Sequence, residues 1–238
     1  MGSSKRPENL DMPVIQTPKG ENMLSYKSNP KLKRMMVTEM KLHRKNDQII
    51  KGTYSKMNGI FKGCAVGCSI HSLNVRLKKN LPTNQHSIYE SELGLPEWLA
   101  RLEDFLFESL PDEEAKNFPV DLLTTIPVGV DLDPVQYRFK KFLLQDNFDC
   151  VHSLKDLDVR VKLQVTEAIK LVMKVIEGTI ETGKVDEAAA RSARSAAESA
   201  ARSARSAAES AGSARWAARS ATIIRYKDEL LRLLKEVN

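Results

Sequence analysis

The segment SIYESELGLPEWLARLEDFLFESLP (87–111) carries the clearest core helix of the chain. Gly94 and Pro96 interrupt the chain first, and a proline suits the first turn of a helix because an N–H there would have no partner. After Pro96 the apolar residues recur every three or four positions, which places them on one face of a helix. Pro111 is expected to end this helix. The apolar face consists of Trp98, Leu99, Leu102, Phe105, Leu106 and Leu110.

Helical spacing continues on both sides of this segment. From 31 to 51 a helical spacing of 4, 3, 4 and 3 links Met36, Met40, His43, Asp47 and Ile50, and Gly52 follows where helices often end on glycine. Downstream, Asp133-Pro134 combines a capping side chain with a first-turn proline, so another helix should begin there. Residues 156–178 repeat the amphipathic pattern. We therefore expect a core built from helices.

Two stretches lack this pattern. Residues 111–132 are rich in proline and aspartate and are expected to form a loop. Residues 52–88 are irregular, and a short helix at 65–72 competes there with a short strand. Nowhere does a series of alternating strands appear. The expected fold class is mostly α, a helical bundle-like core followed by a long alanine-rich C-terminal helix.

That C-terminal helix is built on a repeat. AARSARSAAES occurs at 189–199 and again, letter for letter, at 200–210, and a degenerate copy fills 211–221. Eleven residues in three turns is about 3.67 residues per turn, close to a natural helix, so each residue type keeps its own face. Alanine also has the highest helix propensity. We expect one helix from about 186 to 237 with a leucine-rich end, and a bend or hairpin near Gly212 is the alternative. The alanine stripe comprises Ala189, Ala193, Ala196, Ala200, Ala204, Ala207 and Ala211.

Charge and composition divide the chain. Residues 1–30 are polar and proline-rich, and we expect an extended or disordered arm; 31–184 would form the helical core domain and 185–238 the repeat helix. Residues 1–80 carry 16 Lys and Arg against 5 Asp and Glu, whereas 81–150 carry 5 against 14. Either these two parts pack together and neutralise each other, or the basic part meets nucleic acid or an acidic protein.

The cysteine content and the hydropathy of the chain indicate where in the cell the protein is expected. Three cysteines, Cys64, Cys68 and Cys150, are too few and unevenly placed for a disulfide framework, so reduced thiols are expected. The chain contains no run of about 18 apolar residues, and its first residues lack the apolar stretch of a secretory signal. We therefore expect no membrane span and a cytoplasmic location.

Candidate chemistry lies between residues 43 and 90. In one hypothesis, a Cys/His pocket serves a thiol-based hydrolase or transferase. Cys64 or Cys68 would be the nucleophile, His43 or His71 its base, and Asp47 or Glu90 the group behind the histidine. His43 and Asp47 are four residues apart on the expected helix, so the carboxylate can orient the imidazole. The candidate catalytic residues are His43, Asp47, Cys64, Cys68, His71, Tyr89 and Glu90.

Two other interpretations compete with catalysis. Cys64, Cys68 and His71 could bind zinc, although C-x3-C-x2-H is not a common zinc spacing. Alternatively, small cysteines flanked by glycines pack beneath helices as compact apolar residues. We expect no other cofactor, because no phosphate-binding glycine loop is present.

Several blocks of the sequence resemble a family of uncharacterised bacterial and phage-encoded proteins. The similar segments are HRKNDQIIKGTY (43–54), KGCAVGCSIHS (62–72), YESELGLPEWLARLEDFLFESLP (89–111), IPVGVDLD (126–133) and the Ala/Ser/Arg-rich tail closing on LLRLL (230–234). The resemblance implies a mobile-element setting and interference with a host system, as an anti-defence or anti-CRISPR protein. It implies no mechanism.

Together these observations favour a helical protein that works by binding. Its partner would be another protein, or a second copy bound through the 186–238 helix, and nucleic acid bound by the basic 1–80 region is a further alternative. An enzyme with the Cys/His pocket and a zinc protein remain the competing hypotheses.

Overall fold

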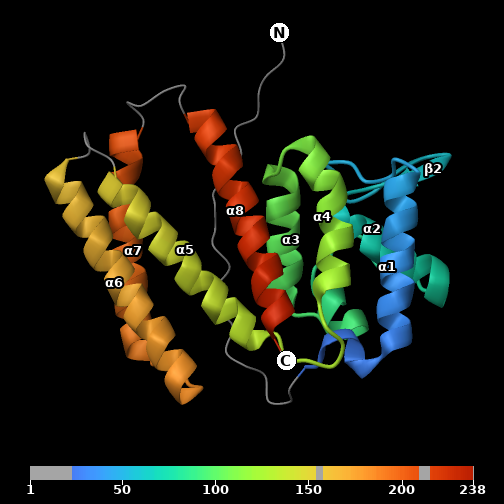
Figure 1. The fold of residues 1–238 in the computed structure, drawn as a ribbon, viewed down its shortest axis with the longest axis horizontal. Helices are drawn as coiled ribbons and strands as arrows, with labels where there is room; N and C mark the ends of the chain where they lie inside the picture. Colours follow the sequence, from blue (N-terminus) through green and yellow to red (C-terminus); the bar gives the residue numbers. More distant parts are fainter. Residues whose placement is uncertain (1–22, 154–157, 209–214, 238) are drawn as a thin grey trace, which may run out of the picture.

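The structure, a computed structural model, describes residues 23–153, 158–208 and 215–237. The fold is mostly α and bundle-like, as predicted, with a small hairpin as the only sheet in the described residues (Figure 1). The elements are the 3-10 turn η1 (Ser25–Ser28), α1 (Pro30–Lys45), β1 (Lys56–Asn58), β2 (Ile60–Lys62), α2 (Ala65–Leu77), the π-turn η2 (Tyr89–Leu93), α3 (Glu97–Ser109), α4 (Asp112–Thr125), α5 (Asp133–Ser153), α6 (Val159–Thr182), α7 (Glu187–Ala208) and α8 (Arg215–Glu236).

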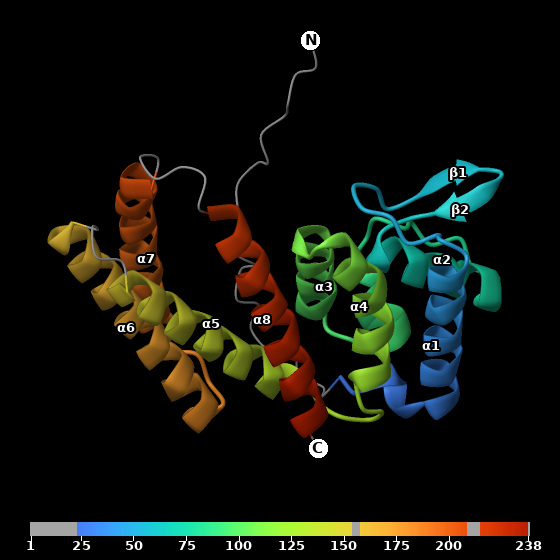
Figure 2. The same ribbon diagram turned by 45° about the horizontal axis from the view of Figure 1, so that its top comes forward.

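The main core lies among α1 to α4, the start of α5, and α8. Helices α6 and α7 lie at the opposite end of the molecule from α1 and the hairpin, with α5 and α8 between them (Figures 1 and 2). No helix in the described ranges is long and apolar enough to cross a bilayer.

The repeat region forms two helices, α7 and α8, so of the two predicted arrangements the single continuous helix is wrong and the interrupted one is found. Helix α7 packs along α6 and buries Ala193 and Ala200 of the alanine stripe. The leucine-rich end belongs to α8. This helix packs against α3, α4 and α5 and completes the main core. The predicted bend at Gly212 lies outside the described residues. The core residues of α8 are Ile223, Leu230, Leu233 and Leu234.

The end of the predicted N-terminal arm is packed into the fold. Residues 1–22 lie outside the described part, but Tyr26 is completely buried and its hydroxyl donates to the carbonyl of Leu123 at 2.7 Å. Tyr26, Lys27 and Ser28 all have left-handed φ angles, a conformation that costs energy for residues other than glycine. Hydrogen bonds between Ser25 and the 127–130 loop hold this turn in place. An extended or disordered arm is therefore the wrong description of 25–28.

Helix α4 replaces a predicted loop. Asp112, Glu113 and Glu114 lie in its first turn, where acidic side chains are favourable next to the positive end of the helix dipole. Pro119 lies inside the helix with its ring buried in the core, and this packing offsets the lost backbone hydrogen bond. The prolines alone were a misleading signal here.

Ion pairs join the basic and acidic parts of the chain. Lys51 pairs with Asp112 at 3.0 Å, and Lys79 pairs with Glu92. The acidic middle is also contacted by α8, where Lys227 reaches Glu114 at 2.6 Å. These contacts agree with the neutralising arrangement, but they involve only some of the basic side chains.

Candidate functional site

The two predicted histidines lie close together. His43, at the end of α1, is buried, and its ring nitrogens contact Gln48 Oε1 at 2.9 Å and Ser72 Oγ at 3.0 Å. His71, on α2, stacks on Phe61 with 3.8 Å between ring centroids. Its centroid is 5.6 Å from that of His43. Burial lowers the pKa of both imidazoles, so both rings are neutral near pH 7.

Asp47 does not orient His43. Helix α1 ends at Lys45, not at 51, and Asp47 lies beyond it in a left-handed turn with its side chain exposed. Gln48 occupies the position behind the imidazole, and its backbone N–H also donates to the carbonyl of His43. The predicted His–Asp pair is therefore wrong, because the helix that would have aligned it ends too early.

The two thiols are buried and have partners other than histidine. Cys64 is the N-cap of α2, where its Sγ accepts the Gly67 N–H at 3.4 Å. The Cys68 thiol donates to the Gly63 carbonyl at 3.4 Å. Burial raises the pKa of both thiols far above the ordinary value. Since the thiolate is the nucleophile, neither cysteine is activated in this arrangement.

The zinc hypothesis has no further support. The described residues contain no group of three or more His, Cys, Asp or Glu side chains placed to hold a metal ion. Cys64 and Cys68 face different partners, and His71 is stacked on Phe61. Zinc binding by these residues stays a prediction.

Tyr89 and Glu90 both form hydrogen bonds with residues of α3. The Tyr89 hydroxyl is buried and donates to Glu103 Oε2 at 2.7 Å. Glu90 Oε1 accepts the backbone N–H of Glu97 at 3.0 Å and so caps the start of α3. Glu103 is completely buried, and burial raises the pKa of its carboxyl to about 8. This carboxyl is therefore protonated near pH 7.

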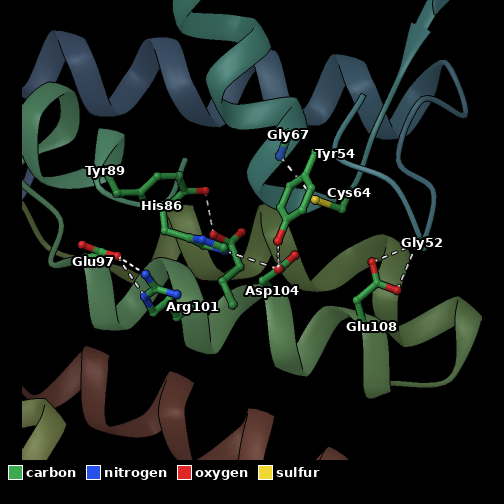
Figure 3. A network of polar contacts seen from close by, with 11 residues as sticks. Gly52, Tyr54, Cys64, Gly67, His86, Tyr89, Glu97, Arg101, Asp104 and Glu108 are labelled. Carbon is green, nitrogen blue, oxygen red and sulfur yellow. Dashed lines mark hydrogen bonds and ion pairs between the residues drawn. The ribbon is translucent and has the colours of Figure 1, made fainter. Parts of the chain in front are cut away.

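Asp104, which the sequence analysis did not single out, contacts residues from several separate segments of the chain. Figure 3 shows Tyr54, His86 and Cys64 around Asp104 of α3. The Tyr54 hydroxyl donates to Asp104 Oδ2 at 2.7 Å, and His86 Nε2 lies 3.3 Å from the same oxygen. The Cys64 thiol lies beside this carboxyl as well (Figure 3). Burial alone would raise the pKa of Asp104, but the hydrogen bonds from His86 and Tyr54 hold it below its ordinary value.

The backbone around Tyr54 is held as firmly as its side chain. Glu108, one turn after Asp104, accepts the Gly52 N–H with both carboxylate oxygens, at 3.0 and 3.1 Å (Figure 3). On the other side, the Tyr54 carbonyl approaches so closely that a Cβ on Gly67 would lie 1.8 Å from it. The glycines near the cysteines thus make room for the 52–54 segment.

The network around Asp104 and Glu108 fastens the 52–54 segment, the start of α2 and the loop at His86 to α3. Its role is therefore structural. Of the surface hollows in the described residues, one lies on the hairpin and one between α5 and α8, and neither of these two is lined by the Asp104 network, Cys64 or Cys68. The hairpin hollow has a volume of about 410 Å³ and lies in the basic part of the chain. It is lined by Ile50, Lys56, Asn58, Ile60 and Lys62.

The strength of the network can be tested at Tyr54. We expect Tyr54→Phe to lower the free energy of unfolding by about 1.5 kcal/mol, because the variant cannot donate a hydrogen bond to the charged carboxylate. Urea unfolding at pH 7 measures this value. The control is Tyr137→Phe, since Tyr137 is also half-buried but its hydroxyl makes no hydrogen bond with the described residues. Equal destabilisation of the two variants would contradict the role given to Asp104.

Comparison with protein-family models, with curated proteins and with solved structures finds no match for this chain.

Proposed function

We propose that the protein acts by binding a partner protein, and that the β1–β2 hairpin is its contact surface. The observation that carries this proposal is the exposure of two large apolar side chains there. Met57 and Ile60 are 66% and 63% exposed. Both residues flank the Gly59 turn, and by the strand register they project from opposite faces of the hairpin, so a partner would enclose its tip. Figure 2 shows the hairpin at one end of the molecule, beside α1 and α2.

The pairing of the hairpin explains how it can present a fixed surface. Met57 is opposite Phe61, and Asn58 and Ile60 flank the Gly59 turn. Phe61 is buried against the rings of His43 and His71, which anchors β2 to the helices. Side chains alternate between the faces of a sheet, so the hollow lies on the face opposite Phe61. The anchored β2 strand thus fixes the tip of the hairpin, where Met57 projects on the face of Phe61 and Ile60 on the other face.

The competing hypotheses have weaker support. A thiol enzyme would need an ionised cysteine, whereas burial raises the pKa of both Cys64 and Cys68. Self-association through the alanine stripe would need α6 to move, because α6 already covers Ala193 and Ala200. Binding through the hairpin requires no such change.

The binding proposal can be tested with two double variants. Partners co-purified with the chain from its host would be identified, produced separately and titrated against purified variants. We expect Met57→Ser with Ile60→Ser to weaken the affinity at least tenfold, because burying each of these apolar side chains against a partner contributes more than about 1 kcal/mol. The matched control is Val159→Ser with Leu163→Ser on α6, where the side chains are 79% and 61% exposed. Unchanged affinity in the hairpin variant would overturn the proposal.

An anti-defence role is the biological setting that we propose for this binding. It rests on the resemblance to phage-encoded proteins alone. The direct test expresses the chain in bacteria with an active CRISPR system and compares phage plating with that of cells that carry the hairpin double variant. A plating efficiency equal to that of cells without the chain would count against the proposed setting.

A further inference from the structure

We propose that Lys56 and Lys62 together receive a carboxylate from an acidic segment of the partner protein. This inference rests on the proposed binding function and names the chemistry of the partner. It places the acidic group over the hollow on the outer face of the hairpin. The site would thus recognise an acidic side chain flanked by apolar ones.

The first support is the pairing register. Lys56 and Lys62 are directly opposite each other on antiparallel strands, so both side chains leave the same face of the sheet. Like charges in such a pair repel each other. A negative group placed between them would reverse the repulsion, since each ammonium could then donate to it. The hairpin therefore has an arrangement that is more favourable with an anion than without one.

The second support is that these two lysines have no acidic partner in the described part of the chain. Lys51 and Lys79, from the same basic region, make ion pairs with Asp112 and Glu92. Arg76 is paired with Glu39. No ion pair or side-chain hydrogen bond joins Lys56 or Lys62 to any residue within 23–153, 158–208 or 215–237. Charge left unmatched within the fold is available to a partner.

The third support is the floor of the hollow. Ile50 and Ile60 line it together with the two lysines and the amide of Asn58. A protein segment can carry an acidic residue next to a leucine or a valine. Its carboxylate would then contact the two lysines, and its apolar side chain would contact Ile50 and Ile60. A nucleic-acid backbone would use the cations but would leave Ile50 and Ile60 without an apolar partner. The hollow therefore favours an acidic protein segment.

Titration by NMR would test the inference, with backbone amides of the full chain as reporters. The probes are a synthetic peptide, Leu-Glu-Glu-Leu-Leu-Glu-Glu, the same peptide with Gln in place of Glu, and a single-stranded DNA oligonucleotide. We expect the Glu peptide to shift the 56–62 amides with saturation. The Gln peptide should bind at least tenfold more weakly. Lys56→Glu should weaken binding of the Glu peptide by a similar factor, and Lys31→Glu, at the far end of α1, should leave it unchanged.

The outcomes separate this inference from the binding proposal. Lys56→Glu places opposite charges across the hairpin, so its unfolding midpoint should not fall, and weaker binding would not reflect unfolding. Equal binding of the Glu and Gln peptides would overturn the carboxylate inference and leave the hairpin as an apolar contact surface. Stronger binding of the DNA at the same amides would overturn it in favour of nucleic acid. If no probe shifts these amides, the carboxylate inference fails. The Met57/Ile60 experiment alone decides whether the hairpin is a contact surface.

Discussion

Replacing Glu103 by glutamine is expected to make the protein more stable at neutral pH. The folded protein holds this carboxyl in its protonated form, with a pKa of about 8, against an ordinary value of 4.5. Between these two values the unfolded chain is ionised and the folded chain is not, so stability falls as the pH rises. Each pH unit in this window costs about 1.4 kcal/mol, which is about 3 kcal/mol by pH 7. The amide of Glu103→Gln does not ionise and avoids this cost, while its oxygen can still accept from Tyr89.

The pH dependence is the sharper measurement. Urea unfolding from pH 5 to pH 8 should show the difference between Glu103→Gln and the parent growing by roughly 3–4 kcal/mol in favour of the variant. Taking the difference removes the contributions of His43 and His71, whose pKa values are lowered and whose effect has the opposite sign. Glu113→Gln is the control, because that side chain is exposed. A difference that stays constant across this range would show that Glu103 is ionised in the fold.

A methyl group on Gly67 is expected to be the most damaging small change in the helical core. The Cβ of Gly67→Ala would lie 1.8 Å from the Tyr54 carbonyl oxygen and 2.7 Å from its carbon. These are backbone atoms, and the 52–54 segment is also fixed by Glu108 and Asp104, so it cannot move aside cheaply. We expect the free energy of unfolding to fall by more than about 3 kcal/mol, at the upper end for overpacking. Urea unfolding measures it.

Gly178→Ala is the matched control for that substitution. Gly178 lies inside α6, and no atom lies within 4 Å of a Cβ built there. Alanine in a helix interior should add about 0.5–1 kcal/mol of stability, because the unfolded chain loses freedom. Opposite signs at the two glycines would confirm that the effect at Gly67 comes from contact with Tyr54. A small effect at Gly67 would mean that the 52–54 segment is free to shift.

The helical fold was predictable where apolar periodicity was strong. Leu99 and Leu106 of α3 and its C-cap residue Leu110 are buried as the predicted face requires, although Phe105 is 39% exposed and Phe107 is buried in its place. The ends of elements were harder. The pattern that suggested a helix to 51 was continued by Ile50, which belongs to the segment beside β2 and not to α1.

The candidate site was less predictable, because its contacts join distant parts of the chain. Local spacing suggested Asp47 as the partner of His43, whereas Gln48 and Ser72 contact the ring. Nothing in the spacing of Asp104 shows that it meets Tyr54 and His86 in the fold. The hairpin did leave a signal that was overlooked, since Asn58-Gly59 is a dipeptide typical of tight hairpin turns.

The position of α8 has a consequence for how the protein is made. The helices that it covers are translated long before it, so a ribosome exposes α3 and α4 with part of their apolar surface uncovered until α8 emerges. Helices α6 and α7 are neighbours in the chain and can pair while this happens. The apolar surface of α3 and α4 therefore stays partly uncovered until α8 has been made, and chaperones can bind it during that interval.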